Sequence, residues 1–503
     1  KKTTIALLST ALIAGLSAQT AATPSDDNTT VDTLAETSKY DVENWQVTQP
    51  PFKLNEVAIS TNETTWSSLD VSPNGKFMIF DMLGDLYKVD IKGGNATPLI
   101  QDFAWNIHPA ISPDGKQVAF VSDRDGLSNV WVMDIDGTHL KQITREKKDI
   151  IHAPKWSPDG EYLVVTKGIM SSRSIPAGEI WMYHKSGGDG LQIKARNSGK
   201  RDQQNIADPA FSHDGRYIYF TENTVPGSRF EYNRDPLEGI FAITRYDRES
   251  GDERRYISGT GGAVVPTPSP DGKYVAFVRR VKDKTALFLK DIKTGTETPL
   301  TFALERDMQE GFGSEGYFTY FDWTPDASAI VYWSRGKFHI INVDSKETET
   351  LNVHIDTTVK FADALRFPVD VAPDNVEVKM TRWSQMSPNG KSILFQALGK
   401  LYVRDVKSGK VKRLTKQNDH DEYYPRYSND GKSIVYTTWN DQDLGTVRVV
   451  SARGGKGKVI SVQPGHYIEP SFSTDGKKVV FRKFTGGSLL DPKYSVDPGI
   501  YVA

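Results

Sequence analysis

Short apolar runs, each ended by a polar turn, recur from about residue 55 onward. In one copy, residues 116–121, 129–134 and 141–144 are rich in β-branched, aromatic or extended-favouring side chains. The turn sequences Asp123-Arg124-Asp125-Gly126 and Asp136-Gly137 separate them. Such runs between turn residues predict β-strands, and the interruptions come too often for helices of about ten residues.

Each unit carries Ser-Pro-Asp-Gly or a close variant before its second run. Proline presets φ at the first corner of a tight turn, Asp or Asn tolerates the next corner, and glycine supplies a positive φ. The copies end at Gly75, Gly115, Gly160, Gly215, Gly272, Ala327, Gly390, Gly431 and Gly476. A period of 40 to 63 residues predicts one four-stranded antiparallel sheet per unit, which is the blade of a β-propeller.

The blades divide into two groups, because an ordinary propeller has about four to eight of them. The widest spacing separates Ala327 from Gly390, and residues 354–378 within it lie outside the repeat. We therefore predict an all-β fold with a six-bladed propeller over residues 55–353, a linking segment, and blades of a second, truncated propeller over residues 379–503. A single eight-bladed ring with one degenerate copy is the alternative. Three blades leave strand edges open, so we expect the natural polypeptide to continue past the last residue.

The N-terminal residues have the features of a targeting segment. Two lysines precede an apolar run from Ile5 to Leu16, and small or polar residues follow it. The run is shorter than the roughly 20 residues that span a bilayer, which disfavours a membrane anchor. Residues 1–22 therefore predict a cleaved signal peptide, and residues 23–54 a disordered leader. We expect a periplasmic or secreted protein with no stable membrane insertion after cleavage.

Composition narrows the classes of partner and of chemistry. The 62 Lys and Arg residues nearly balance the 64 Asp and Glu residues, which leaves a formal charge of −2 and disfavours a nucleic-acid partner. The sequence has no cysteine, which excludes disulfides, thiolate metal sites, a cysteine nucleophile and a lipoprotein anchor.

The repeat resembles a known family. The Ser-Pro-Asp-Gly-Lys pattern, together with residues 122–126 and Val130-Trp131-Val132-Met133-Asp134, is similar to the TolB-like propeller repeat, which tricorn protease and prolyl-oligopeptidase relatives also contain. The resemblance extends over residues 60–503 and implies the propeller fold. It implies little about function.

A narrower resemblance concerns the second group of blades. Residues 394–402, 422–425, 436–441 and 466–470 resemble the propeller half of secreted proteins with a C-terminal amidohydrolase domain. In that family a metal-dependent barrel after the propellers performs the chemistry. The resemblance implies no cofactor in these residues, and a divalent metal only in a C-terminal hydrolase domain.

The sequence itself contains no recognisable catalytic motif. None of the nine histidines is two positions from another, so the His-x-His of an amidohydrolase barrel is absent, as is the Gly-x-Ser-x-Gly nucleophile motif. Asp123 and Asp125 are too few for a calcium loop and predict a blade turn. We expect no catalytic residue and no metal site.

Polar residues near the start of the predicted inner strands are the candidate binding residues. These strands begin at a rim of a propeller channel, and prolines such as Pro109 and Pro209 lie beside them. The candidates are His108, His152 and Asp208 in the first ring, and His420, Glu422, Tyr424, His466 and Glu469 in the second. The alternative is structural, since a residue before proline is normally held extended and would cap the strand.

Three functions follow from these observations. The leading hypothesis is a non-catalytic, exported propeller region that shields or filters access to a C-terminal hydrolase domain resembling amidohydrolases. The first alternative is a stand-alone TolB-like periplasmic propeller that binds an envelope protein or peptide. The second is the propeller part of a serine peptidase of the tricorn or prolyl-oligopeptidase kind.

Overall fold

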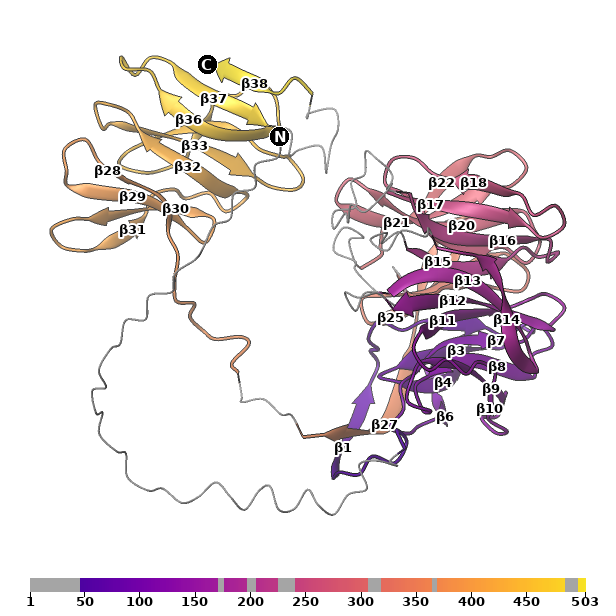
Figure 1. Cartoon of the computed structure of the whole chain (residues 1–503). Helices are drawn as coiled ribbons and strands as arrows, with labels where there is room; N and C mark the ends of the chain where they lie inside the picture. The colour runs from indigo at the N-terminus through magenta and orange to yellow at the C-terminus, as the bar shows by residue number, and fades with distance from the viewer. Residues whose placement is uncertain are drawn as a thin grey trace, which may run out of the picture. The chain divides into compact units, whose positions relative to one another are not determined.

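The computed structural model describes residues 46–170, 176–196, 205–224, 240–305, 318–363, 369–484 and 496–503. Within these ranges all regular secondary structure is β-strand, in two groups of sheets (Figure 1). The expected signal peptide and most of the expected leader lie outside the described residues. The all-β propeller fold predicted from the repeat is confirmed.

The first group contains six four-stranded antiparallel sheets, one for each of the first six turn motifs. From the inner strand outward, blades one to three are β2 (Leu69–Val71), β3 (Phe77–Met82), β4 (Asp85–Asp90) and β6 (Thr97–Ile100); β7 (Asn106–Ile111), β8 (Gln117–Ser122), β9 (Asn129–Asp134) and β10 (Lys141–Gln142); and β11 (Ile150–Trp156), β12 (Tyr162–Met170), β13 (Pro176–His184) and β14 (Gly187–Lys194). Blades four to six are β15 (Ile206–Phe211), β16 (Tyr217–Asn223), β17 (Phe241–Asp247) and β18 (Glu253–Ile257); β19 (Val264–Pro268), β20 (Tyr274–Val281), β21 (Lys284–Asp291) and β22 (Glu297–Thr301); and β23 (Asp322–Trp323), β24 (Ala329–Ser334), β25 (Lys337–Asn342) and β26 (Thr348–Leu351).

The turn motif is held by its serine as well as by proline and glycine. In blade two, Ser112 Oγ accepts the N–H of Gln117 at 2.9 Å and donates to Asp114 Oδ1 at 2.6 Å. The same carboxylate oxygen accepts the N–H of Lys116 at 3.0 Å, and Gly115 adopts φ +70°. These bonds close the hairpin between the first two strands, and they recur in the other blades.

The sixth blade packs against the first, which closes the ring. The N–H of Leu69 donates to the carbonyl of Tyr320 at 3.1 Å, and the rings of Phe80 and Phe338 lie 4.7 Å apart. Aliphatic and aromatic side chains of both blades form one buried cluster there. Closure buries the apolar sheet faces of blades one and six that an incomplete ring would expose.

A latch, the three-stranded sheet β1-β27-β5, joins the two ends of the ring. β1 (Leu54–Thr61) pairs antiparallel with β27 (Val353–Ala362) along its whole length, and β5 (Gly94–Asn95) pairs in parallel with the first residues of β27. The Tyr87 hydroxyl lies 2.9 Å from Thr357 Oγ1, which ties the latch to blade one. The segment expected to be a linker therefore begins with a strand that belongs to the ring.

The second group contains three sheets within the described residues. They are β28 (Arg382–Met386), β29 (Ser392–Ala397), β30 (Lys400–Asp405) and β31 (Val411–Arg413); β32 (Asp421–Tyr427), β33 (Ser433–Trp439), β34 (Val447–Ser451) and β35 (Lys458–Val459); and β36 (His466–Phe472), β37 (Val479–Phe484) and β38 (Gly499–Val502). Buried clusters lie between the first and second of these sheets and between the second and third. We call them blades seven, eight and nine.

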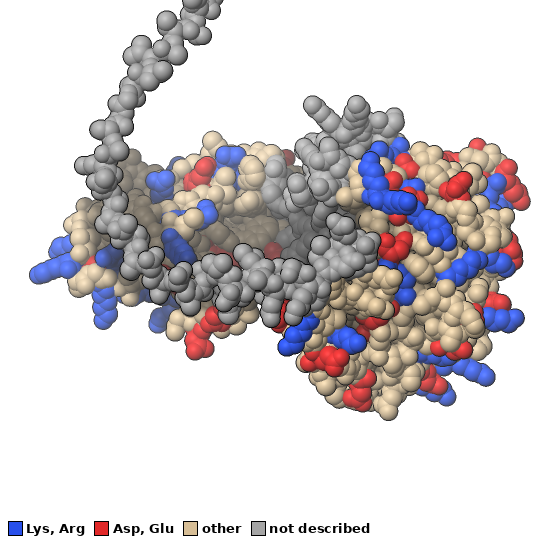
Figure 2. Space-filling view, turned by 60° about the horizontal axis from the view of Figure 1, so that its bottom comes forward, with Lys and Arg blue, Asp and Glu red and all other residues tan. Residues whose placement is uncertain are grey.

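The surface carries charges of both signs. Lys and Arg are interspersed with Asp and Glu over the face seen in Figure 2, which agrees with the small net charge. Among the residues that the structure describes, no helix is long and apolar enough to cross a membrane.

Candidate binding site in the first ring

The inner strands of blades two to five share a β-bulge. Each bulge lies seven residues before the last residue of the turn motif and directly before a proline, with φ values of +54° at His108, +56° at Ala153, +54° at Asp208 and +55° at Val265. The pairing register with the second strand shifts across each bulge. Proline has no N–H, so it occupies a position where the ladder needs no donor. The residue before the proline is therefore left-handed, and the expectation that it would be extended is wrong.

Two layers of side chains surround the channel of the first ring, each at a fixed distance from the turn. Seven residues before the last turn residue stand Ser68, His108, Ala153, Asp208, Val265 and Tyr320. Five residues before it stand Asp70, Ala110, Lys155, Ala210, Thr267 and Asp322. All of these except Ser68 and His108 line one cavity of about 360 Å³, which we call the channel cavity.

The turn motifs line the same cavity. Pro113, Pro158 and Pro270 contribute their rings, and His213 occupies the equivalent position in blade four. The channel cavity therefore extends to the side of the ring on which the Ser-Pro-Asp-Gly turns lie. Its walls consist of the turn prolines and of inner strands, each paired with the second strand of its own blade.

A lysine and two aspartates from three blades meet in this cavity. Lys155 Nζ lies 2.9 Å from Asp70 Oδ1, and Asp70 Oδ2 accepts the N–H of Ile111 at 2.7 Å. Asp322 Oδ2 accepts the N–H of Val71 at 2.9 Å. Burial and the neighbouring Asp70 raise the pKa of Asp322 to about 7. Burial opposes the charge of Lys155, but Asp70 and Asp322 outweigh it and raise the pKa of the lysine.

A second polar group lies at the bulge layer. Asp208 Oδ1 accepts the Tyr320 hydroxyl at 2.8 Å, and its Oδ2 accepts the Thr221 hydroxyl at 2.9 Å. Burial raises the pKa of Asp208 to about 6. The ring of Tyr320 also meets the ring of His108 edge-on, with centroids 4.9 Å apart. Tyr320 thus connects two of the three candidates that the sequence indicated for this ring.

The two buried histidines of the first ring are neutral at pH 7. Burial, His152 and Lys155 lower the pKa of His108 to about 3, and burial lowers that of His152 to about 4. Nδ1 of His108 and both ring nitrogens of His152 have no hydrogen-bond partner among the described residues. Tyr320 contacts both Asp208 and His108, and these three residues form the polar group of the bulge layer. His152 lies one residue before the bulge of its strand and is not part of this group.

The second group of blades does not gather its candidates around one cavity of the described residues. Glu422 is fully buried, and its Oε2 accepts the Leu401 N–H at 2.9 Å and the Thr415 hydroxyl at 2.7 Å. Burial raises the pKa of Glu422 and lowers that of His420, whose Nδ1 lies 2.9 Å from Asp419 Oδ1. The bonds of Glu422 tie blade seven to blade eight.

The remaining candidates of this group lie along the inner strands. Tyr424 and Glu469 occupy the bulge position, with φ values of +50° and +55°. The ring of Tyr424 lies 4.3 Å from that of Trp383, and His466 packs between two aromatic rings. The cavity of about 450 Å³ in this group is lined by other residues. No group of three or more His, Asp or Glu side chains within the described ranges could hold a metal ion.

Sequence reasoning missed four residues of the channel cavity. Asp70, Lys155 and Asp322 lie five residues before the last turn residue, and Tyr320 lies seven before it. Counting back from each turn motif would have found them, because charged residues stand there on strands that are otherwise apolar. The proline signal pointed to the bulge and its neighbour and so found His108, His152 and Asp208, of which Asp208 alone lines the channel cavity.

Comparison with known proteins identifies the same propeller repeat. Residues 56–184 match the model of the TolB beta propeller domain. Similar proteins include a putative tricorn-like protease C-terminal subunit of Sulfurisphaera tokodaii, 24% identical over 45% of this chain, and an uncharacterized peptidase, YuxL, of Bacillus subtilis, 28% identical over 28% of it. The crystal structure of TolB from Acinetobacter baumannii aligns with 58% of this chain and 65% of its own, at 20% identity and a TM-score of 0.43.

This chain matches only about a quarter of the length of each of these two curated relatives. The matched regions cover 27% of the tricorn-like subunit and 25% of the Bacillus peptidase. Most of each of these two relatives therefore lies outside the comparison.

Proposed function

We propose that this chain, a β-propeller protein with repeats of the TolB and tricorn type, is the polypeptide-binding region of an exported hydrolase. Its six-bladed ring takes up a polypeptide segment in the channel cavity and does not itself catalyse. The observation that carries this proposal is the channel cavity of about 360 Å³, with polar groups from several blades around it. Concave sites with a few convergent polar groups on a rigid scaffold are the usual form of binding sites.

The charges of the channel cavity favour a cationic group on the bound segment. Among the described residues that line this cavity, three carboxyl groups, those of Asp70, Asp208 and Asp322, accompany one lysine, Lys155. His108 and His152 add no positive charge at pH 7. A lysine or arginine side chain, or an amino terminus, would restore the balance. A carboxylate would meet repulsion from the excess of negative charge.

The hydrolase itself is proposed as a further domain of the same polypeptide. Two similar proteins are described as a protease subunit and a peptidase, and each is far longer than its matched region. These relatives support a peptidase as the companion. The resemblance of blades seven to nine to amidohydrolase-linked propellers supports a metal-dependent amidohydrolase, in which a divalent metal would reside. In either case the propeller would shield or filter access to that active site.

Export rests on the N-terminal sequence. We propose a periplasmic or secreted location, reached through cleavage of residues 1–22. The partner would then be the companion catalytic domain, or an envelope protein or peptide that enters the channel cavity. A nucleic-acid partner does not suit the nearly neutral charge.

Binding of a cationic peptide should strengthen with pH. We expect a random hexapeptide library with a fixed lysine to bind at pH 8 about tenfold more tightly than the same library with norleucine, a difference of about 1.4 kcal/mol. The preference should shrink at pH 5, because Asp208 and Asp322, with pKa values of about 6 and about 7, then take up protons. Fluorescence anisotropy of the labelled libraries measures both quantities.

Two variants test the assignment. Asp322→Asn keeps an acceptor for Val71 but removes a charge, so it should reduce both the lysine preference and its pH dependence. Asp344→Asn removes an exposed charge from blade six and should change neither. Absence of binding by either library at any pH would contradict a polypeptide-binding function. Equal binding of both libraries would leave that function and overturn the cationic preference.

A further inference from the structure

The charges of this chain are divided unequally between its two groups of blades. Residues 379–503 contain 21 Lys and Arg against 11 Asp and Glu, whereas residues 55–378 contain 37 Lys and Arg against 47 Asp and Glu. The small net charge of the whole chain therefore combines a basic second group with an acidic first ring. Such an asymmetry indicates that one part of a chain meets an anionic partner.

Basic residues of the second group gather on turns that lie side by side. In blade seven the N–H of Val406 donates to the carbonyl of Lys391 at 2.9 Å, which places the hairpin turn beside the turn before the outer strand; blade eight repeats this bond at 2.8 Å. Asn429 Nδ2 donates to the carbonyl of Thr474 at 3.0 Å, which joins the turns of blades eight and nine. We call this surface the turn face, and it consists of residues 387–391, 405–410, 428–432, 451–456 and 473–478.

Cations outnumber carboxylates on the turn face. Its three carboxyl groups, those of Asp405, Asp430 and Asp475, accept hydrogen bonds within their own turns, which hold their pKa values below the ordinary value. Lys432 Nζ lies 3.5 Å from Asp430 Oδ2, and no other cation of the face pairs with a described carboxylate. All the basic residues of the face are exposed. They are Lys391, Lys407, Lys410, Lys432, Arg453, Lys456, Lys477 and Lys478.

The other described carboxylates of the second group lie away from this face. They stand at or before the bulge of an inner strand, or between the second and third strands, which is the other end of the blades. These residues are Asp419, Asp421, Glu422, Asp441, Asp443, Glu469 and Asp497. The repeat itself does not require basic turns, because the equivalent turns of blade two carry three aspartates and one lysine.

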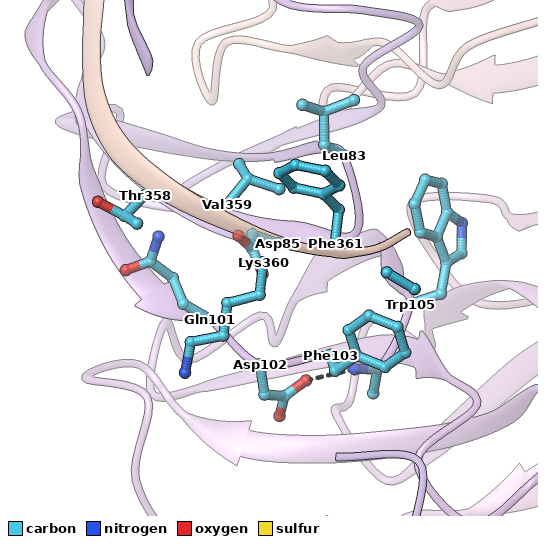
Figure 3. Close-up of a pocket in the computed structure, with 12 residues that line it drawn as sticks. Leu83, Asp85, Gln101, Asp102, Phe103, Trp105, Thr358, Val359, Lys360 and Phe361 are labelled. Atoms are coloured by element: carbon cyan, nitrogen blue, oxygen red, sulfur yellow. Dashed lines mark hydrogen bonds between the residues drawn. The ribbon is translucent and has the colours of Figure 1, made fainter. Parts of the chain in front are cut away.

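A cavity of about 450 Å³ lies on the turn face between blades seven and eight. Lys410, Lys412 and Arg453 line it together with one carboxylate, that of Asp405, and several hydroxyl groups. Cavities of the first ring have the opposite balance: the channel cavity holds three aspartates and one lysine, and a pocket of about 310 Å³ beside β27 holds two aspartates and one lysine (Figure 3). Three cations beside hydroxyl donors are a favourable setting for a phosphate group.

We propose that the turn face attaches this chain to the surface of a membrane that contains anionic phospholipids, with one headgroup phosphate in the cavity between blades seven and eight. Cations on neighbouring turns meet several lipid phosphates at once, and each cation adds to the attraction. The attachment is peripheral, and no segment crosses the bilayer. It depends neither on the channel cavity nor on the proposed polypeptide-binding function.

Two features of the face favour a lipid surface over a nucleic acid. None of its turns contains an aromatic residue, whereas proteins that bind single strands stack bases on aromatic rings. Val406 exposes 48% of its surface beside Lys407, and an apolar side chain among lysines is typical of proteins that lie in the membrane interface.

Co-sedimentation with sucrose-loaded vesicles tests the proposal. The protein lacks residues 1–22, because the apolar run of the predicted signal peptide would itself enter a bilayer. Vesicles of phosphatidylcholine with about one third phosphatidylglycerol should bind this protein about tenfold more tightly than pure phosphatidylcholine vesicles in about 0.1 M NaCl. The preference should disappear in 1 M NaCl, where the Debye length is only about 3 Å. Equal binding to both kinds of vesicle in the lower salt would overturn the proposal.

Two triple variants locate the contact. The first removes the three cations of the cavity and should weaken binding to the anionic vesicles about tenfold or more. It carries the substitutions Lys410→Gln, Lys412→Gln and Arg453→Gln. The second removes the same charge from exposed residues at the other end of the blades and should weaken binding less than twofold. It carries the substitutions Lys379→Gln, Arg382→Gln and Lys416→Gln.

The remaining outcomes separate this surface from other anionic partners and from the channel cavity. Asp322→Asn, which changes the channel cavity, should leave vesicle binding unchanged. An equal loss of binding in both triple variants would show that net charge, and not the turn face, directs the attachment. Tighter binding to double-stranded DNA than to the anionic vesicles, at equal phosphate concentration, would overturn the lipid surface in favour of a nucleic acid. Circular dichroism of each variant confirms that the blades remain folded.

Discussion

Replacing Asp81 by alanine should lower the free energy of unfolding of the first ring by about 4 kcal/mol. This buried carboxylate on β3 accepts the N–H of Ser68 through Oδ1 at 2.9 Å and the N–H of His108 through Oδ2 at 2.8 Å. Ser68 and His108 occupy equivalent positions in blades one and two. Alanine would leave both buried donors without this acceptor, and each unsatisfied donor costs about 1 to 3 kcal/mol.

Two further variants distinguish the loss of the two hydrogen bonds of Asp81 from the loss of a negative charge. Asp81→Asn keeps one carbonyl oxygen but turns an amide N–H₂ toward the second donor, so about half of the loss should remain. Asp90→Ala removes an exposed carboxylate that accepts one bond, from the N–H of Lys92, and should cost less than about 1 kcal/mol. Denaturant unfolding followed by circular dichroism gives the stabilities. Hydrogen exchange should show faster exchange in blades one and two. If Asp81→Ala unfolds no more easily than Asp90→Ala, the carboxylate does not join the blades.

The repeat predicted the blades because its information is local. Pro, Asp and Gly fix the turn, the flanking runs are strands, and their period sets one sheet per copy. The contribution of the serine was not foreseen. Its hydroxyl accepts a backbone N–H five residues later, as Ser112 does from Gln117, and a hydroxyl placed at that distance is a signal that could be read from sequence.

The latch could not be predicted, because it depends on pairing between distant segments. The pattern around residues 54–61 and 353–362 permits strands, but nothing local indicates that they pair with each other. The first was assigned, apart from residue 54, to the start of the six-bladed propeller, and the second, apart from residue 353, to the linking segment. Sequence spacing locates elements that are neighbours along the chain, whereas the partner of an isolated strand depends on how the ring closes.

The candidate site was only partly predicted, because the proline signal does not show which side chains face the channel. Proline marked the bulge and so led to His108 and Asp208, but the same signal selected Glu422, which bonds to blade seven, and His420, which pairs with the adjacent Asp419. Whether a polar residue near the start of an inner strand faces a channel depends on its exact distance from the turn. Lys155 and Asp322 share that distance and were overlooked, because neither precedes a proline.

Replacing Gly178 by alanine should destabilise the contact between blades three and four by about 3 kcal/mol or more. A Cβ atom at this position of β13 would meet the backbone carbonyl oxygen of Ile206, on β15 of the next blade, far inside van der Waals contact. The N–H of Gly178 also donates to Asn205 Oδ1 at 2.8 Å, and this side-chain atom would lie only 2.8 Å from the new methyl group. Neither strand can withdraw without opening the packing between two blades, because both are backbone-paired within their own sheets.

Gly499→Ala provides the matched control for this steric effect. Gly499 also lies in a strand, and the nearest atom to its added Cβ would be 3.8 Å away, which is ordinary contact. Its replacement should therefore change stability by less than about 1 kcal/mol. Thermal unfolding of both variants by calorimetry gives the comparison, and hydrogen exchange in β13 and β15 localises the change. A Gly178→Ala protein as stable as Gly499→Ala would show that blades three and four are not packed backbone to backbone. In that case, the close approach of β13 and β15 would not explain why residue 178 is glycine.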